Sequence, residues 1–306
     1  MEKKKLDALK KKYEGSLVST AWDIPNFDFI STGSVVFDTS LWWGIPKWRV
    51  VEVFWENSCL KTTMAMLTVK DAQSKWIKCL FIDAECSVSL EHIKNLWVDL
   101  NELIYVQPDC AENWMRIAKE FIETWEVWLV IIDSVACMTP MIEAEQEIGN
   151  AHMWKSARLR NQFLRVITPV LSKTWCVLLL INQIRASMDM FSWVTTTWWK
   201  GIAYHASQRI QMLKPKIEWT DVYMRYKIHK NKVRWQLWEW DTLIHMQWWV
   251  DVMYDLVTMW CMCGVIEKKG AWYSYNGKDY QWRKSLTDMP TEDIESLKKA
   301  IKKLSK

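Results

Sequence analysis

The amino-acid sequence predicts an α/β protein with a mostly parallel central sheet that carries helices on both faces. Four short apolar runs follow one another along the chain, and only Glu52 interrupts them. Amphipathic stretches lie between the runs, at residues 62–74, 111–124 and 155–172. Runs this short are typical of strands buried on both faces, and their alternation with helices favours a doubly wound sheet. The runs cover residues 50–54, 79–82, 128–132 and 177–181.

The N-terminal segment differs from the region that follows it. Residues 1–15 predict a basic helix, because Leu6, Leu9 and Tyr13 recur at helical spacing and Gly15 follows them. Residues 16–29 contain a proline and lack periodicity, so we expect a linker there. These residues are assigned to an N-terminal helix and linker (1–29), and the α/β core is predicted to cover residues 30–250.

The C-terminal segment is predicted to form a small α+β domain over residues 251–306. The strand–helix alternation fades after Trp240. Residues 270–277 have the composition of strands and turns, and residues 291–306 predict a basic helix that begins after Pro290.

Composition excludes several classes of protein. No apolar run approaches the roughly 18 residues that a membrane span requires, and the lysine-rich start does not resemble a secretory signal. We therefore expect a cytoplasmic protein with no membrane partner. The net charge of +4 is compatible with nucleic acid but does not demonstrate it. The eight cysteines form no CxxC pair, which favours reduced structural thiols over a zinc site.

The segment after the first apolar run has the layout of a phosphate-binding loop. A strand, a loop ending in Lys-Thr-Thr and then a helix would place Lys61 on the β- and γ-phosphates and Thr62 on Mg²⁺. That loop needs glycine at the positions of Trp55 and Leu60, because its backbone N–H groups approach the phosphates closely. A solvated Lys-Thr-Thr at a helix start remains an alternative. The segment comprises Trp55, Glu56, Asn57, Ser58, Cys59, Leu60, Lys61, Thr62 and Thr63.

The other three apolar runs also end in polar residues. The second is followed by Asp83 and Glu85, the third by Asp133 and the fourth by Asn182 and Gln183. An acidic residue that closes an apolar strand can help to hold Mg²⁺, although it can equally cap the next turn. Ligands of open α/β sheets bind at the carboxyl ends of the strands, so four such ends together predict one nucleotide site.

An ordered series of motifs makes the chain resemble the bacterial RecA family over nearly its whole length. The series begins with Ile30-Ser31-Thr32-Gly33-Ser34 and Phe81-Ile82-Asp83-Ala84-Glu85. It continues with Asp133-Ser134-Val135-Ala136 and with Glu147-Ile148-Gly149, His152 and Met153. It ends with Asn182-Gln183-Ile184-Arg185, Thr195-Thr196-Thr197, Ala206-Ser207, Lys230-Asn231-Lys232 and Ala271-Trp272-Tyr273-Ser274-Tyr275.

This resemblance implies a RecA-like P-loop ATPase core and an ATP-dependent DNA recombinase. The family's pattern would make Glu85 the general base for ATP hydrolysis and Gln183 the coupling residue, and Lys61 would be the third catalytic residue. Thr62 and Asp133 would hold Mg²⁺, and His92 stands where the family has an aromatic residue beside adenine. Lys230 and Lys232 would reach the ATP of a neighbouring protomer. DNA-binding residues would be Arg158, Arg165, Arg185, Thr195, Thr196 and Thr197.

The expected partners are single-stranded and double-stranded DNA and further copies of the chain in a helical filament. The N-terminal helix would serve oligomerisation. The basic C-terminus lacks the acidic tail common in the family, which would leave duplex binding less restrained. Two alternatives stay open: a non-hydrolysing DNA-binding RecA paralogue, and a related ring-forming DNA ATPase.

Tryptophan and glycine occur in unusual proportions. The chain has 24 tryptophans and 8 glycines, whereas about 7% glycine, or about 20 residues, would be typical of this length. Aligned with the family, seven tryptophans fall on glycine positions, whereas Trp272 falls on a tryptophan. The hypothesis that follows is that a codon written here as tryptophan, with UGA as the candidate, is glycine in the source cell. Leu60 is a separate departure. The seven are Trp43, Trp48, Trp55, Trp97, Trp154, Trp198 and Trp199.

Overall fold

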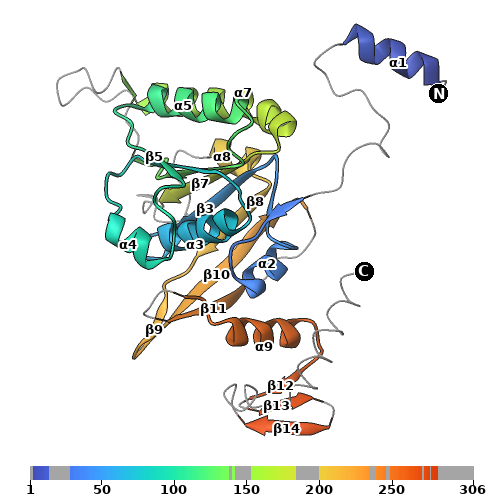
Figure 1. The fold of residues 1–306 in the computed structure, drawn as a ribbon, viewed down its shortest axis with the longest axis vertical. Helices are drawn as coiled ribbons and strands as arrows, with labels where there is room; N and C mark the ends of the chain where they lie inside the picture. Colours follow the sequence, from blue (N-terminus) through green and yellow to red (C-terminus); the bar gives the residue numbers. More distant parts are fainter. Residues whose placement is uncertain are drawn as a thin grey trace.

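The computed structural model describes residues 3–13, 28–137, 140–141, 153–183, 200–233, 239–245, 249–270, 272–275 and 277–281. Its centre is a nine-stranded sheet with the order β11-β10-β8-β3-β7-β6-β4-β5, and β9 pairs with β10 outside this path (Figure 1). Strands β8, β3, β7, β6, β4 and β5 are mutually parallel, whereas β10 runs antiparallel to β8, β9 and β11. The predicted α/β fold with a mostly parallel central sheet is therefore confirmed.

The four predicted strands form the middle of this sheet. They are β3 (Val50–Trp55), β4 (Cys79–Asp83), β6 (Leu129–Asp133) and β7 (Val177–Gln183). Each extends to the polar or aromatic residue after its apolar run, because that residue still pairs with the neighbouring strand. β5 (Leu103–Val106) forms the edge beside β4 and was not predicted, since three of its four residues are only half-buried.

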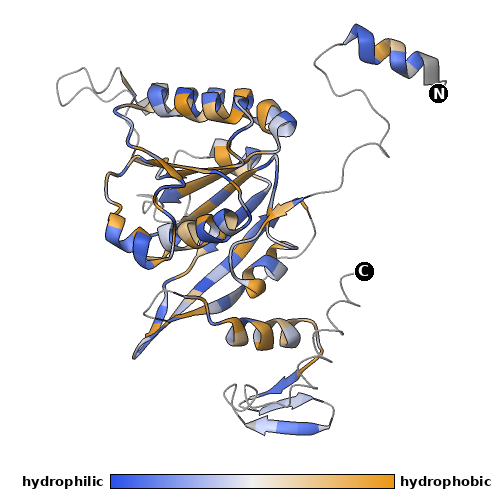
Figure 2. Cartoon of the chain, viewed as in Figure 1, coloured by the Kyte–Doolittle hydropathy of each residue, from blue (hydrophilic) through white to orange (hydrophobic). Residues whose placement is uncertain are grey.

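Helices cover both faces of the sheet, and alternate residues of each strand pack toward them. One face packs against α2 (Val35–Leu41), α3 (Lys61–Ser74) and α9 (Val252–Met262), with Val53 and Phe81 in that core. The other packs against α5 (Ala111–Glu123), α7 (Met153–Thr174) and α8 (Lys200–His205), with Leu80 and Ile82 in a second core. Figure 2 shows the alternation of hydrophobic and hydrophilic residues along α5. α4 (Leu90–Asn95) follows β4.

The part of the sheet beyond β3, which is parallel at β8 and antiparallel from β10 onward, was missing from the sequence prediction. It contains β8 (Gln208–Met212), β9 (Lys216–Glu218), β10 (Asp221–Asn231) and β11 (Glu239–His245). β10 alternates buried Val222, Met224 and Tyr226 with exposed Arg225 and Lys227, a half-buried pattern that the search for continuous apolar runs overlooks.

Short elements complete the described chain. The N-terminal helix α1 spans Lys3–Lys12, and β1 (Phe29–Ile30) pairs with β2 (Ile45–Pro46). A three-stranded antiparallel sheet of β12 (Glu267–Lys269), β13 (Trp272–Tyr275) and β14 (Lys278–Gln281) follows α9. The helix predicted over residues 291–306 lies outside the described residues. None of the helices in the described part of the chain is long and apolar enough to cross a bilayer.

Candidate nucleotide-binding site

The loop between β3 and α3 has the backbone of an anion-binding turn. Ser58 and Leu60 both adopt a φ of 59°, and Leu60 stands at the N-cap of α3 with left-handed geometry. Among the described residues no side chain caps this helix. The first backbone N–H groups of α3 are therefore available to a phosphate, and the positive end of the helix dipole favours its charge.

Lys61, the first residue of α3, holds the loop in its present shape. Its ammonium donates hydrogen bonds to the carbonyl oxygens of Trp55, at 3.2 Å, and Glu56, at 2.5 Å. The side chain is buried, and burial lowers its pKa against the opposing effect of nearby acidic groups. A cation whose hydrogen bonds go to carbonyl oxygens is well placed to exchange them for an anion.

Thr62 and Asp133 bring a hydroxyl and a carboxylate together beside Lys61. The Thr62 hydroxyl donates to Asp133 Oδ2 at 2.5 Å, from the start of α3 to the end of β6. Asp133 is buried, and desolvation raises its pKa to about 6 although the Thr62 hydrogen bond acts in the opposite direction. Mg²⁺ prefers hydroxyl and carboxylate oxygens, and a divalent cation would relieve this buried carboxylate, so the residues present fit the ion.

Glu85 and Gln183 meet across the same cleft from two different strands. The Gln183 amide, at the end of β7, donates a short hydrogen bond to Glu85 Oε1, two residues beyond the end of β4. The distance along the chain is 98 residues, so the parallel strand order creates this contact. When either residue of such a hydrogen-bonded pair binds a ligand, the hydrogen bond can break and the carboxylate becomes accessible.

These groups line one cleft with a volume of about 390 Å³, within the range of small-molecule sites. The structure thus brings together the loop and three strand ends that the sequence predicts to share an edge of the sheet. The lining residues are Asn57, Ser58, Cys59, Leu60, Lys61, Thr62, Thr63, Glu85, Asp133 and Gln183.

His92 lies beside Thr63, in the first turn of α3. Its Nε2 is 3.4 Å from the Thr63 hydroxyl, and burial lowers its pKa. An imidazole with a lowered pKa is neutral at pH 7, so it can offer an uncharged aromatic face to a base.

Lys230 and Lys232 lie at the opposite end of the parallel strands, where β3 and β8 begin. Lys230 pairs with Arg209 at the start of β8, and its ammonium donates to the carbonyls of Ala203 and Tyr204 at 2.6 and 3.3 Å. Lys232 lines a second cleft of about 390 Å³ beside Arg49 and Val50, where β3 begins. Within one chain these lysines therefore do not reach the first cleft, which Lys61, Glu85 and Asp133 line.

The structure describes two of the six predicted DNA-binding residues. Arg158 and Arg165 are exposed on α7. The remaining predicted DNA-binding residues, Arg185, Thr195, Thr196 and Thr197, lie outside the described residues, as do Glu147, Ile148, Gly149 and His152.

Two buried carboxylates near the cleft have partners that the sequence did not predict. Asp83 is fully buried, accepts a hydrogen bond from the Tyr105 hydroxyl at 2.7 Å and leaves Oδ1 without a partner among the described residues. Burial and Asp83 together raise the pKa of Tyr105 to about 12. Glu52 is also fully buried, and a lone acid inside an apolar strand was the available signal.

Glu52 of β3 connects this strand to its two neighbours, β7 and β8, through hydrogen bonds. It accepts from the Asn182 amide at 2.9 Å and from Arg209 Nε at 2.5 Å. Asn182 precedes Gln183, and the Arg209 guanidinium lies 4.6 Å from the centre of the Phe54 ring. The strand that leads into the loop is thereby tied to the strand that ends at Gln183.

Comparison with known proteins gives a consistent result. The family described as RecA N-terminal domain matches residues 3–246. The chain is 35% identical over 262 residues to Protein RecA of Ehrlichia canis (strain Jake), covering 83% of this chain and 73% of that protein. It is 35% identical over 289 residues to Protein RecA of Rickettsia bellii (strain RML369-C), covering 89% and 82%. Protein RecA of a Wolbachia from Drosophila simulans is equally similar over 261 residues.

Proposed function

This chain belongs to the RecA family, and we propose that it is an ATP-dependent DNA recombinase that acts in recombinational repair. The observation that carries the proposal is the convergence of the loop, Thr62, Glu85, Asp133 and Gln183 in one cleft. Family members are DNA-dependent ATPases. For this chain, ATP as substrate and Mg²⁺ as cofactor are proposals supported by the donor groups of the cleft.

The cleft residues divide the work of hydrolysis. Lys61 and the free N–H groups at the start of α3 would bind the phosphates, while Thr62 and Asp133 would hold Mg²⁺, which neutralises developing negative charge when bound. Glu85 would accept a proton from the attacking water, and the γ-phosphoryl group would pass to that water as ADP leaves. Gln183 would hold Glu85 in place through the hydrogen bond between its amide and the carboxylate.

DNA binding and assembly complete the proposal. Arg158 and Arg165, with Arg185 and Thr195 to Thr197, would contact phosphates of single-stranded DNA, so affinity would fall with salt and depend little on sequence. Homologous duplex would be recognised by base pairing. Lys230 and Lys232 would reach the ATP of the next protomer in a filament. We also propose a cytoplasmic location and a division into residues 1–29, 30–250 and 251–306.

Substitution of the proposed base tests this function. In Glu85→Gln we expect DNA-stimulated ATP hydrolysis to fall by about 10²–10⁴-fold, while ATP-dependent binding to single-stranded DNA persists. Glu120→Gln, an exposed carboxylate on α5, is the control and should keep the parent rate. Hydrolysis at the parent rate in Glu85→Gln would exclude Glu85 as the base. A parent chain that binds DNA without hydrolysing ATP would match the non-hydrolysing alternative.

A further inference from the structure

The backbone separates the tryptophans into two groups. Among the described residues other than glycine, twelve have a positive φ, and nine of these twelve are tryptophans. Eight of the nine have φ between 54° and 76°. This left-handed region crowds the Cβ atom against the following carbonyl oxygen, so side chains as bulky as indole are rare outliers there. The eight are Trp42, Trp43, Trp48, Trp76, Trp97, Trp125, Trp175 and Trp219.

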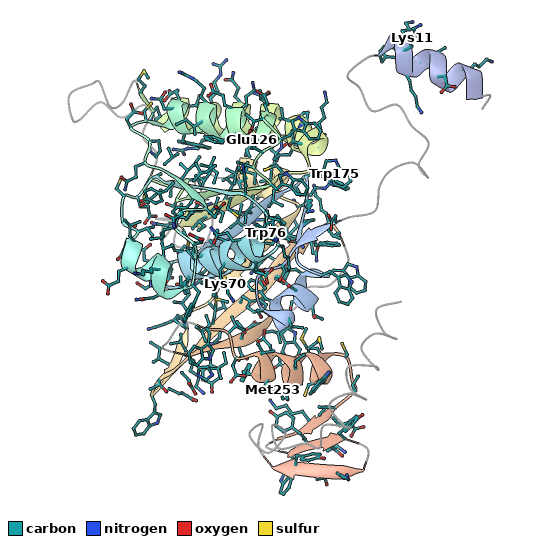
Figure 3. All side chains as sticks on the ribbon, in the orientation of Figure 1. Lys11, Lys70, Trp76, Glu126, Trp175 and Met253 are labelled. Carbon is teal, nitrogen blue, oxygen red and sulfur yellow. The ribbon has the colours of Figure 1, made fainter. Side chains whose placement is uncertain are left out.

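Five of these tryptophans stand where a helix ends. Trp42 is the C-cap of α2, while Trp76, Trp97 and Trp125 follow the C-caps of α3, α4 and α5. Trp175 directly follows the last residue of α7. Figure 3 labels Trp76 and Trp175. A left-handed residue just past a helix is the position at which glycine is most strongly enriched, because it lets the chain turn back onto the last carbonyls.

The chain itself provides the matching case with glycine. After α9, Gly264 has a φ of 69°, its N–H donates to the carbonyl of Cys261, and the N–H of Val265 donates to that of Trp260. After α3, Trp76 has a φ of 60°, its N–H donates to Gln73, and the next N–H donates to Ala72. Both ends are the same capping motif in hydrogen bonds and in spacing. They differ in the residue that has the positive φ, which is Gly264 after α9 and Trp76 after α3.

Two turns show the same pattern. Trp219 is the first residue of a two-residue hairpin between β9 and β10, in which Glu218 pairs with Asp221. Its φ of 55°, with no positive φ at Thr220, matches the turn type that takes glycine at this position. Trp42, Trp43 and Gly44 form three consecutive residues with positive φ, at 67°, 76° and 117°. Such a run suits glycine and opposes side chains with a Cβ atom.

Several of the indole rings also gain little from burial. Trp76 is 94% exposed and Trp219 is 96% exposed, and Trp97 and Trp125 are mostly exposed. Burial of apolar surface therefore compensates little of their backbone strain. Trp48 and Trp175 differ, since their rings pack on each other with centroids 4.5 Å apart.

From these observations we infer that the source cell places glycine at the eight left-handed tryptophan positions, by decoding UGA as glycine. UGA differs from the tryptophan codon UGG in its third base and from the glycine codon GGA in its first. One changed base in the anticodon of a glycine tRNA would therefore suffice to read it. Trp272, which lies in strand β13 without a positive φ, would be a true tryptophan encoded by UGG. The inference rests on backbone geometry and holds whether or not the proposed ATPase activity is found.

Peptide mapping of the protein purified from its own source tests the inference directly. We expect glycine in the peptides that contain positions 76, 97, 125 and 219, and tryptophan in the peptide that contains position 272. The gene should carry UGA at all eight positions and UGG at position 272. Tryptophan at the eight positions, or UGG codons there, would overturn the inference.

A second experiment measures the strain in a host with the ordinary code. The chain as written is compared with variants that carry Trp76→Gly or Trp219→Gly. Each is expected to raise the midpoint of thermal unfolding by about 2–4 °C, because each removes a left-handed side chain that is almost fully exposed. Trp272→Gly is the control and should lower the midpoint. Unchanged or lower midpoints in the first two variants would count against the inference.

Discussion

Leu60 adopts a left-handed backbone conformation in the loop between β3 and α3 and is not one of the tryptophans. A leucine with φ 59° and ψ 26° costs about 1–2 kcal/mol relative to glycine. Leu60→Gly is therefore expected to raise the free energy of unfolding by less than that amount, because the added freedom of the unfolded chain offsets part of the gain. It should also tighten binding of an ATP analogue, because the loop N–H groups would be less shielded.

Leu60→Ala separates the two effects, since alanine removes the bulk and keeps the Cβ atom. Denaturant unfolding and analogue titration are the measurements. Equal stability of the glycine and alanine variants would show that backbone strain at this position is negligible.

Asp133 makes stability depend on pH in an unusual direction. Burial raises its folded pKa to about 6, above the value of about 3.9 in an unfolded chain. Between these values the folded state binds more protons, so this residue lowers stability as pH rises from about 4 to about 6, and the loss is complete above that range. A pKa difference of about two units corresponds to at most about 3 kcal/mol in the free energy of unfolding.

Asp133→Asn isolates that contribution from Asp38 and Asp255, whose pKa values are also raised to about 6 by burial. The stability difference between variant and parent should grow in favour of the variant from pH 4 to pH 6 and then level off. Mg²⁺-dependent binding of nucleotide should be lost. A difference that is constant with pH would contradict the raised pKa.

At the scale of elements, the network of Glu52 joins the three strands that support the cleft. Glu52 is fully buried, and removal of Arg209 would leave its charge without its cationic partner. Arg209→Met is expected to lower the free energy of unfolding by about 3–5 kcal/mol. The double variant Glu52→Leu with Arg209→Met should recover part of that loss, because no buried charge remains. Chemical denaturation of the parent, the two single variants Glu52→Leu and Arg209→Met, and the double variant measures the coupling, and an additive result would refute it.

The sequence predicts the central strands because continuous apolar runs mark strands buried on both faces. It predicts the shared edge of Glu85, Asp133 and Gln183, because parallel strands align their carboxyl ends. It does not predict β10, whose alternating pattern is weaker per residue, or the partners of Glu52. Asn182 and Arg209 lie 130 and 157 residues further along the chain, and such contacts depend on strand order rather than on local pattern.

At the scale of the whole molecule, α9 packs against the core although it lies beyond the predicted boundary at residue 250. Val257, Met259 and Trp260 are buried in the core cluster that contains α2 and α3, and Asp255 accepts hydrogen bonds from Ser34 and Thr242. A chain that ends after Val250 is expected to lose several kcal/mol of stability, because burial of each such side chain contributes about 1.5–3 kcal/mol.

A chain that ends after Ile266 keeps α9 and is the matched control for this truncation. Its unfolding midpoint should stay close to that of the full chain. Thermal unfolding of both truncated chains gives the comparison, and equal losses would mean that α9 contributes little to the core.

Lys230 and Lys232 lie at the end of the parallel strands opposite the cleft that Lys61 and Asp133 line. This position has a consequence for the growth of the proposed filament. Two chains related by a twofold axis would meet through like surfaces, whereas contact between the lysine edge of one chain and the cleft of the next is head-to-tail. An assembly built in this way has polarity. One terminal subunit presents an open cleft and the other presents bare lysines, so subunits would be gained and lost at different rates at the two ends.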